Sequence, residues 1–207
     1  MLLLLTGFEP FGGSNRNPSE QVSRALDGQS VAGLRVQSAI LPVDRQRGPD
    51  ALLAAIARHR PAAVVCLGEA ASRAVVSLER VAINLMDYRI ADNAGNLIVD
   101  QPIIPGGPAA YFANLPLRAM QAAVLETGVP VELSLSAGAF LCNQVMYHLL
   151  HHLALNAPEV PGGLIHLPGL PEQAALAGKG APSMSLETSL RAVRAALCAL
   201  PLPANPD

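Results

Sequence analysis

The sequence predicts an α/β fold: a three-layer sandwich with a mainly parallel central sheet, helices on both faces and an antiparallel hairpin excursion. The main observation is that short, continuous apolar runs of strand length alternate with longer segments of helical periodicity, which is typical of layered folds with parallel strands. A second observation is that residues 73–103 break this alternation. They read as two strands joined by a turn, DNAG, at residues 92–95.

The first elements are the most strongly specified. Residues 2–5 form an apolar run that we expect to be a buried strand. The helix expected at Pro18–Leu26 has Asn17 as its N-cap, proline at its first position and Glu20 at its third. Side-chain capping of free N–H groups, the fixed φ of proline and the helix dipole favour these three residues at these places.

The remaining elements continue the alternation. We expect further strands at residues 34–43, 62–68, 130–136 and 162–168, and further helices at residues 50–59, 140–155 and 185–200. Neither an internal repeat nor a linker interrupts the pattern, so residues 1–207 are expected to fold as a single domain. The proline-rich tail, residues 201–207, is expected to fray.

Composition limits the class of protein and its surroundings. A formal charge of −2 lacks the basic field that nucleic acids require, and no apolar run reaches the length of a membrane span. The N-terminal run is too short for a signal peptide and lacks its basic flank. The three cysteines show no CxxC spacing. We therefore expect a cytoplasmic protein without a nucleic-acid partner, a membrane segment, a disulfide framework or a zinc site.

Cys142 differs from the other cysteines in its position. Cys66 lies in an apolar strand and Cys198 on the apolar face of the last helix, so both are expected to be buried packing residues. Cys142 also shares a helix face with apolar residues, and the pattern alone leaves a packing role open. However, it follows the turn SAGAF and falls in the first helical turn, where free N–H groups and the helix dipole favour a thiolate. A nucleophile is the alternative interpretation.

A thiol nucleophile requires an imidazole as its base. His166 ends the apolar run GGLIH, at the carboxyl end of a strand, where the functional groups of open α/β sheets gather. A buried structural histidine stays open as an interpretation. His148 and His152 are four residues apart on one helix and resemble a metal pair, but no third ligand accompanies them. We expect no metal site.

Three acidic residues could orient the imidazole. Glu79, in the run VVSLERVAIN, is also consistent with a salt-bridged strand residue. Asp87 follows in the same region, and Glu69 comes directly after the glycine that ends a buried strand. The first loop, TGFEPFGGSNRNP, lacks the spacing of a phosphate-binding loop. Its Phe8 and Phe11 either wall a small apolar pocket or close the loop onto the core.

Six blocks of the chain, in order, carry a resemblance to a known family. They read TGFEPFGGSNRNPSE, ERVAINLMDYRIADNAGN, PIIPGGPAAYF, LSAGAFLCNQVMYHLLH, IHLPGLPEQ and APSMSLET. The sequence resembles pyroglutamyl peptidase I, or pyrrolidone-carboxylate peptidase, a family of cysteine peptidases, over nearly the whole chain. The resemblance implies a single catalytic domain at residues 1–207 that hydrolyses the amide bond after an N-terminal pyroglutamate (5-oxoproline).

The family's functional residues transfer onto this chain motif by motif. The resemblance implies that Cys142, His166 and Glu79 form a catalytic triad and that Arg89 assists at the oxyanion. The positions that contact the lactam ring in the family correspond to Phe8, Phe11, Asn17, Ile90 and Phe140.

The chain departs from the family pattern at the end of one strand. The family often carries GQAGGR where this chain reads GEAASR, so Glu69 replaces a glutamine that recognises the lactam. A carboxylate accepts from the ring N–H but donates to the ring carbonyl only when protonated. Gln144, where a histidine is common, is a lesser departure.

The resemblance also implies partners. It implies pyroglutamyl peptides as substrates, no cofactor, and a homo-oligomer with a tetramer favoured. Two other functions stay open: a nucleoside phosphorylase-like enzyme on a related fold, and a catalytically inactive module that binds lactam-capped peptide ends. The lack of a basic anion site in the first loop weighs against the former, and the presence of all three triad residues weighs against the latter.

Overall fold

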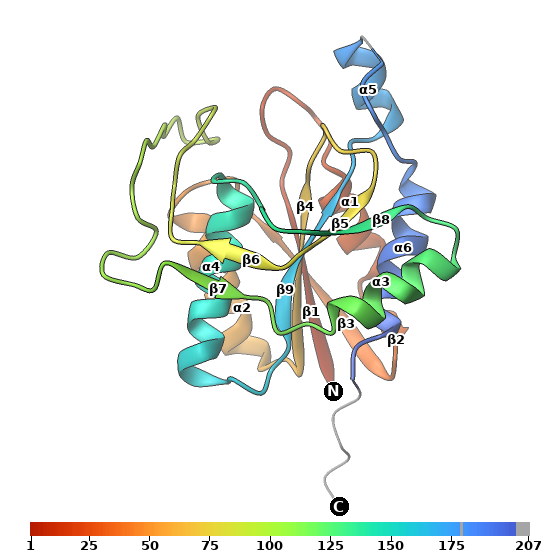
Figure 1. The fold of residues 1–207 in the computed structure, drawn as a ribbon, viewed down its shortest axis with the longest axis horizontal. Coiled ribbons are helices and arrows are strands. Elements are labelled where there is room, and N and C mark those ends of the chain that lie inside the picture. The colour runs from red at the N-terminus through yellow and green to blue at the C-terminus, as the bar shows by residue number, and fades with distance from the viewer. Residues whose placement is uncertain (179, 202–207) are drawn as a thin grey trace, which may run out of the picture.

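The computed structural model describes residues 1–178 and 180–201 and shows an α/β protein built around one twisted sheet (Figure 1). The strands of this sheet are β1 (Leu2–Phe8), β2 (Ser30–Val31), β3 (Leu34–Leu41), β4 (Ala63–Glu69), β5 (Val76–Glu79), β8 (Val131–Ser134) and β9 (Gly162–Leu167). They lie in the order β2-β3-β1-β4-β9-β5-β8. The central strands β3, β1, β4 and β9 are parallel, whereas the parallel pair β5 and β8 runs antiparallel to β9.

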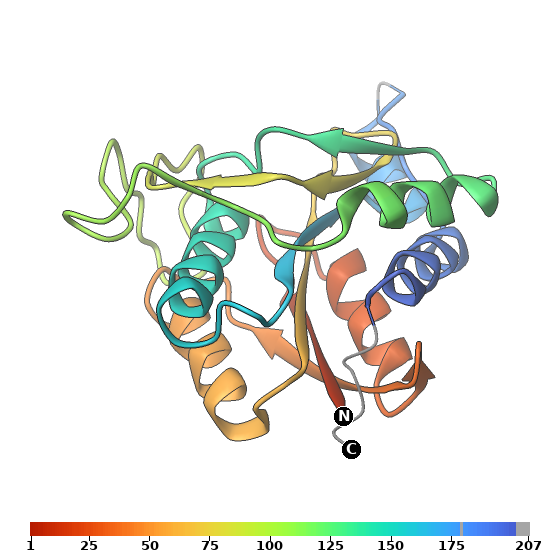
Figure 2. The same ribbon diagram turned by 60° about the horizontal axis from the view of Figure 1, so that its bottom comes forward.

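Helices cover both faces of the sheet, as predicted (Figure 2). The helices are α1 (Pro18–Leu26), α2 (Arg47–His59), α3 (Leu117–Glu126), α4 (Leu141–Asn156), α5 (Pro171–Ala177) and α6 (Leu186–Cys198). Helices α2 and α4 bury one apolar cluster against the sheet, and α1, α3 and α6 bury a second cluster on its other face. In β4 the alternation of side chains directs Val64 and Cys66 toward α2 and α4, and Val65 and Leu67 toward the opposite face.

The expected helix starts have clear physical causes. The side chain of Asn17 accepts a hydrogen bond from the N–H of Ser19, which confirms the N-cap prediction for α1. Helix α2 begins at Arg47, three residues earlier than expected, because Asp44 Oδ1 accepts from the N–H groups of Gln46 and Arg47. This carboxylate takes the capping role that the sequence pattern did not reveal.

The antiparallel excursion is present, but its second strand is not where the pattern placed it. The turn at residues 92–95 forms, yet residues 96–103 contain only an isolated bridge from Gln101 to Met86. The strand that pairs with β6 (Val81–Ile83) is instead β7 (Ala110–Phe112). Residues 96–103 keep separate backbone hydrogen bonds to Met86 and Tyr88, and the Asn84 side chain then fixes Ile104 by bonding to both its N–H and its carbonyl.

Other expectations differ in outcome. The sequence pattern did not indicate β2, β7, α3 or α5. The prediction that Cys198 is buried is wrong: it is the last residue of α6 and is exposed. The predicted fraying at residues 201–207 falls, apart from Pro201, outside the described residues. Within the described residues, no helix has both the length and the apolar composition needed to span a membrane.

Candidate active site

Cys142 and His166 meet above a single glycine. Cys142 is the second residue of α4, and Gly68 and His166 are register partners in β4 and β9. A Cβ atom on Gly68 would lie 2.8 Å from Cys142 Sγ and 3.0 Å from His166 Nε2. The thiol and the imidazole therefore share the space above Gly68, which only a residue without a side chain leaves open.

The other nitrogen of the same ring faces a carboxylate. His166 Nδ1 lies 2.8 Å from Glu79 Oε1, and the two side chains are 4% and 0% exposed. Strand β5 runs antiparallel to β9 and pairs Ser77 with His166, so Glu79, two residues further along, lies on the same sheet face. The three residues thus form a continuous line from thiol to imidazole to carboxylate.

The charges in this line support one another. Burial disfavours a charged imidazole, but the charges of Cys142 and Glu79 and their hydrogen bonds raise the pKa of His166 to about 9. Burial alone would raise the pKa of Glu79, but the hydrogen bond and charge of His166, with smaller contributions from the Ser134 hydroxyl and Arg73, hold it below its usual value. At neutral pH the arrangement favours an imidazolium paired with the ionised Glu79, beside the Cys142 thiol.

The beginning of α4 leaves backbone donors beside Cys142. Phe140, at the N-cap position, provides no side-chain cap, and the helical hydrogen bonds begin at the N–H of Gln144. Asn143 fixes this turn in place, because its side chain bonds to the N–H and carbonyl of Ile83 and to the carbonyl of Leu85. The first N–H groups of the helix can therefore stabilise a negatively charged oxygen near Sγ.

Two adjoining cavities open at Cys142. The larger has a volume of about 800 Å³, and Cys142, His166, Glu69, Arg89 and Phe140 are among its lining residues. The smaller has a volume of about 10 Å³, and its lining residues are Phe8, Phe11, Asn17, Val43, Glu69, Phe140, Leu141 and Cys142. We call the larger one the outer cavity and the smaller one the inner pocket. The inner pocket is mostly apolar, with Glu69 and Asn17 as its polar side chains.

Those two polar side chains are held differently. Asn17 uses its amide within the N-terminal loop, accepting from Ser19 and donating to the carbonyl of Glu9. Glu69 Oε1 accepts a hydrogen bond of 2.9 Å from Gln173 Nε2. Burial raises the pKa of Glu69 to about 7, although the Gln173 hydrogen bond opposes this. Glu69 can therefore change protonation state near neutral pH.

The structure brings most of the sequence-predicted residues together, with some differences in place. Phe8 and Phe11 both line the inner pocket, and Phe8 is also part of the core, so wall and plug are combined. Ile90 lies against Gly12 of the first loop and does not line either cavity as the described residues define them. Among the described residues, no group of three or more His, Cys, Asp or Glu side chains has a metal-site arrangement.

Sequence reasoning missed three contributors to the site. Gly68 had a usable signal, since a glycine inside a buried strand often marks a close approach. Arg73, in the loop after β4, binds Glu79 directly, and Gln173, in α5, binds Glu69. Neither partnership has a sequence signal, because each joins residues whose proximity depends on the whole fold.

Comparison with known proteins identifies the family. The family model for pyroglutamyl peptidase matches residues 1–201. The pyrrolidone-carboxylate peptidase of Gloeobacter violaceus is 49% identical over 95% of this chain and 95% of its own length. That of Escherichia fergusonii is 48% identical over 94% of this chain and 90% of its own length.

Solved structures agree with these relatives. Pyroglutamyl peptidase I from Bacillus amyloliquefaciens superposes with a TM-score of 0.92 at 37% identity, covering 96% of this chain and 95% of that one. A mutant pyrrolidone carboxyl peptidase from Pyrococcus furiosus has a TM-score of 0.93 at 40% identity, with coverage of 97% and 98%. The class is therefore that of the cysteine peptidases. The chain belongs to the pyroglutamyl peptidase family, and its activity is the removal of pyroglutamate from the N-terminus of peptides.

Proposed function

We propose that Cys142, His166 and Glu79 carry out this hydrolysis as a catalytic triad. The single observation that supports the proposal best is the convergence of Cys142 Sγ and His166 Nε2 over Gly68, with Glu79 on the other ring nitrogen. The Cys142 thiolate attacks the acyl carbon of the pyroglutamyl residue and forms a thioester. His166 protonates the departing amine, and water then releases pyroglutamate and restores the thiol.

The remaining site residues have supporting roles in the proposal. Backbone N–H groups at the start of α4 stabilise the negative charge on the carbonyl oxygen, and Arg89 at the rim of the outer cavity assists them. Glu79 orients the imidazole and stabilises its positive charge. The outer cavity has room for the peptide beyond the scissile bond.

We propose that the lactam ring occupies the inner pocket. Phe8, Phe11 and Phe140 give it the apolar walls that suit an uncharged ring, and Glu69 supplies a polar contact. A pocket of about 10 Å³ is too small for this ring, so the walls must separate when substrate binds. Phe11 is placed to move, because it precedes Gly12 and Gly13, which both have positive φ. Ile90 lies beside Gly12, so it would contact the ring only after the loop that contains Phe11 and Gly12 has moved.

The proposal is tested by releasing a fluorophore from a pyroglutamyl-linked reporter, with a prolyl-linked reporter as the control. Turnover of the first and not of the second supports recognition of the lactam. Equal turnover of both would show that the inner pocket does not read the ring carbonyl. A nucleoside incubated with phosphate serves as a further control, since its cleavage would indicate phosphorylase chemistry.

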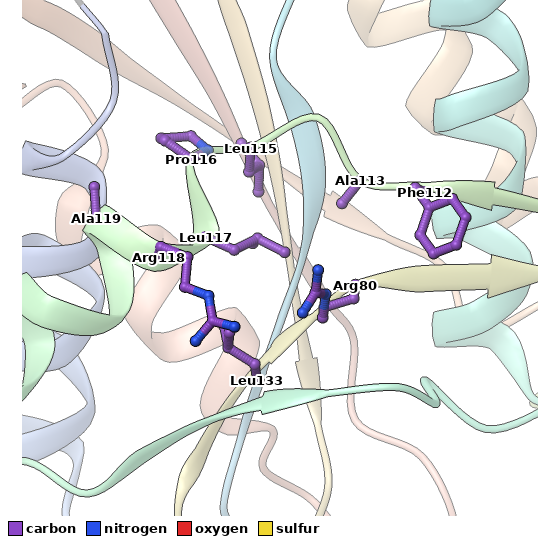
Figure 3. Close-up of a pocket in the computed structure, with 9 residues that line it drawn as sticks. All are labelled: Arg80, Phe112, Ala113, Leu115, Pro116, Leu117, Arg118, Ala119 and Leu133. Atoms are coloured by element: carbon purple, nitrogen blue, oxygen red, sulfur yellow. The ribbon is translucent and has the colours of Figure 1, made fainter.

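We also infer that the protein is a homo-oligomer, with a tetramer favoured, in the reducing cytoplasm. Large apolar side chains are exposed on and near the small sheet, with Phe112 74% and Val99 60% exposed. Phe112 borders a hollow of about 540 Å³ between β7 and α3 (Figure 3). All three cysteines are free thiols, which fits a reducing compartment. Light scattering on the wild type and on Phe112→Ser tests the assembly, and a monomeric wild type would contradict it.

A further inference from the structure

Arg73 extends the line of charges behind the proposed triad. Its Nη1 atom lies 2.6 Å from Glu79 Oε1, and its Nη2 atom donates a 2.7 Å hydrogen bond to the carbonyl of Ser136. The backbone N–H of Arg73 bonds to the carbonyl of Ala70, so the loop after β4 fixes this residue at its base. The Arg73 side chain is therefore fixed at its base and at its guanidinium, and it is 25% exposed.

The two cationic partners of Glu79 bind the same oxygen. Oε1 receives both Arg73 Nη1 at 2.6 Å and His166 Nδ1 at 2.8 Å, whereas Oε2 is buried without a hydrogen-bond partner among the described residues. A buried carboxylate with one satisfied oxygen depends on its charged partners to stay ionised. Without the guanidinium, His166 would be the only cationic partner left, beside the neutral Ser134 hydroxyl, to offset the desolvation of Glu79.

We propose that Arg73 is a positioning residue that acts through Glu79, keeping the carboxylate ionised and aimed at His166 Nδ1. The inference rests on the proposed triad. Arg73, Glu79 and His166 then alternate in charge beside the Cys142 thiol, and removing Arg73 withdraws a positive charge from the buried carboxylate. The carboxyl group takes up a proton more readily, and a protonated Glu79 no longer stabilises the imidazolium.

The surroundings of Glu79 leave Arg73 as its cationic partner besides His166. From β8, Ser134 is its register partner, with a neutral hydroxyl, and Glu132 lies 4.0 Å from Arg73 Nη1. Glu132 is 49% exposed and accepts from Ser77, so solvent screens its charge. From β9 and α4 come His166 and, beyond it, Cys142. Arg80, the next residue in the chain, points into the hollow beside Phe112 and α3 (Figure 3).

The experiment compares Arg73→Met, Arg73→Lys and Arg80→Met with the wild type on a pyroglutamyl reporter across pH. Arg73→Met should lower kcat about tenfold or more, the effect of a lost charge-assisted hydrogen bond, with KM within about twofold. As the pH is lowered, this variant should lose activity at a higher pH than the wild type does, because the depressed pKa of Glu79 moves upward. Arg73→Lys keeps the charge, so it should lose activity at the same acidic pH as the wild type and should recover part of kcat. Arg80→Met should behave as the wild type.

Several results would overturn the proposal. Unchanged kcat and an unchanged acid side in Arg73→Met would show that Glu79 does not need Arg73. A raised KM with normal kcat would assign Arg73 to substrate binding instead. The rate of Cys142 alkylation across pH separates this inference from the proposed function, because it needs no substrate. If Arg73→Met fails to fold, Arg73→Lys decides the question alone. Loss of activity at the same acidic pH as in Arg80→Met would support the role of the charge, and loss of activity at a higher pH would contradict it.

Discussion

His166 Nδ1 lies 2.8 Å from Glu79 Oε1 in the interior of the protein, and both side chains are almost completely buried. The contact fixes which ring nitrogen faces the carboxylate and leaves Nε2 directed at the space it shares with Cys142. The geometry therefore separates the two roles: His166 is placed to exchange a proton with the thiol, and Glu79 is placed to orient the imidazole.

We expect His166→Ala and Glu79→Gln to differ in severity. His166→Ala should lower kcat/KM at least about a thousandfold, because no other base replaces it, and Glu79→Gln should have a smaller effect. Alkylation of Cys142 at neutral pH should slow in the His166 variant. Alkylation at the wild-type rate would mean that the imidazole does not activate the thiol.

Gly68→Ala should inactivate the protein through sterics alone. The new Cβ would lie 2.8 Å from Cys142 Sγ and 2.9 Å from His166 Cδ2, so the two reacting groups must separate. We expect kcat to fall about a hundredfold or more, as small misplacements of reacting groups do, while circular dichroism shows a folded protein. Gly169→Ala is the matched control, because its Cβ would approach nothing closer than Ala71 at 3.4 Å. Equal activity in Gly68→Ala and wild type would contradict the close approach.

Glu69→Gln should change the pH dependence of substrate binding. The pKa of Glu69 is raised to about 7, so below that pH the protonated side chain can donate to the lactam carbonyl, and above it the carboxylate cannot. The wild-type kcat/KM should therefore decline as pH rises through about 7 relative to the variant, which keeps a donor at every pH. Above pH 7 the variant should exceed the wild type by roughly two- to tenfold, the value of one hydrogen bond.

The Glu69→Gln comparison can also contradict this prediction. If Glu69 faces only Gln173 and a backbone N–H serves the carbonyl, the two pH profiles on one pyroglutamyl reporter will superimpose. A Gln173→Ala variant is the matched control for the pair, since it removes the hydrogen bond that Glu69 now accepts. That change should raise the pH at which the wild-type decline occurs, because the hydrogen bond lowers the pKa of Glu69.

Much of this fold could be predicted because its signals are local. The capped start of α1 at Asn17 and the apolar run of β4 depend on neighbouring residues alone. Residues 96–103 could not be placed, because their backbone hydrogen bonds to Met86 and Tyr88 are isolated and form no continuous ladder. Cys198 could not be called exposed from periodicity, since it falls at the very end of α6.

The site divides in the same way. Helix-start and strand-end positions suggested Cys142 and His166, and the structure brings them together. Glu79 needed the family resemblance, because its contact with His166 depends on β5 lying next to β9 and antiparallel to it. The contact of Arg73 with Glu79 depends on a loop conformation that no periodicity encodes.

The most direct measurement is capture of the acyl intermediate on the thiol. Wild type, Cys142→Ser, Cys66→Ala and Cys198→Ala are each mixed with a pyroglutamyl reporter, and turnover and intact mass after acid quenching are recorded. We predict that wild type, Cys66→Ala and Cys198→Ala turn over and carry a pyroglutamyl adduct at Cys142, and that Cys142→Ser folds but loses at least about a thousandfold in kcat. Near-wild-type turnover by Cys142→Ser, or an adduct on another residue, would contradict nucleophilic catalysis by Cys142.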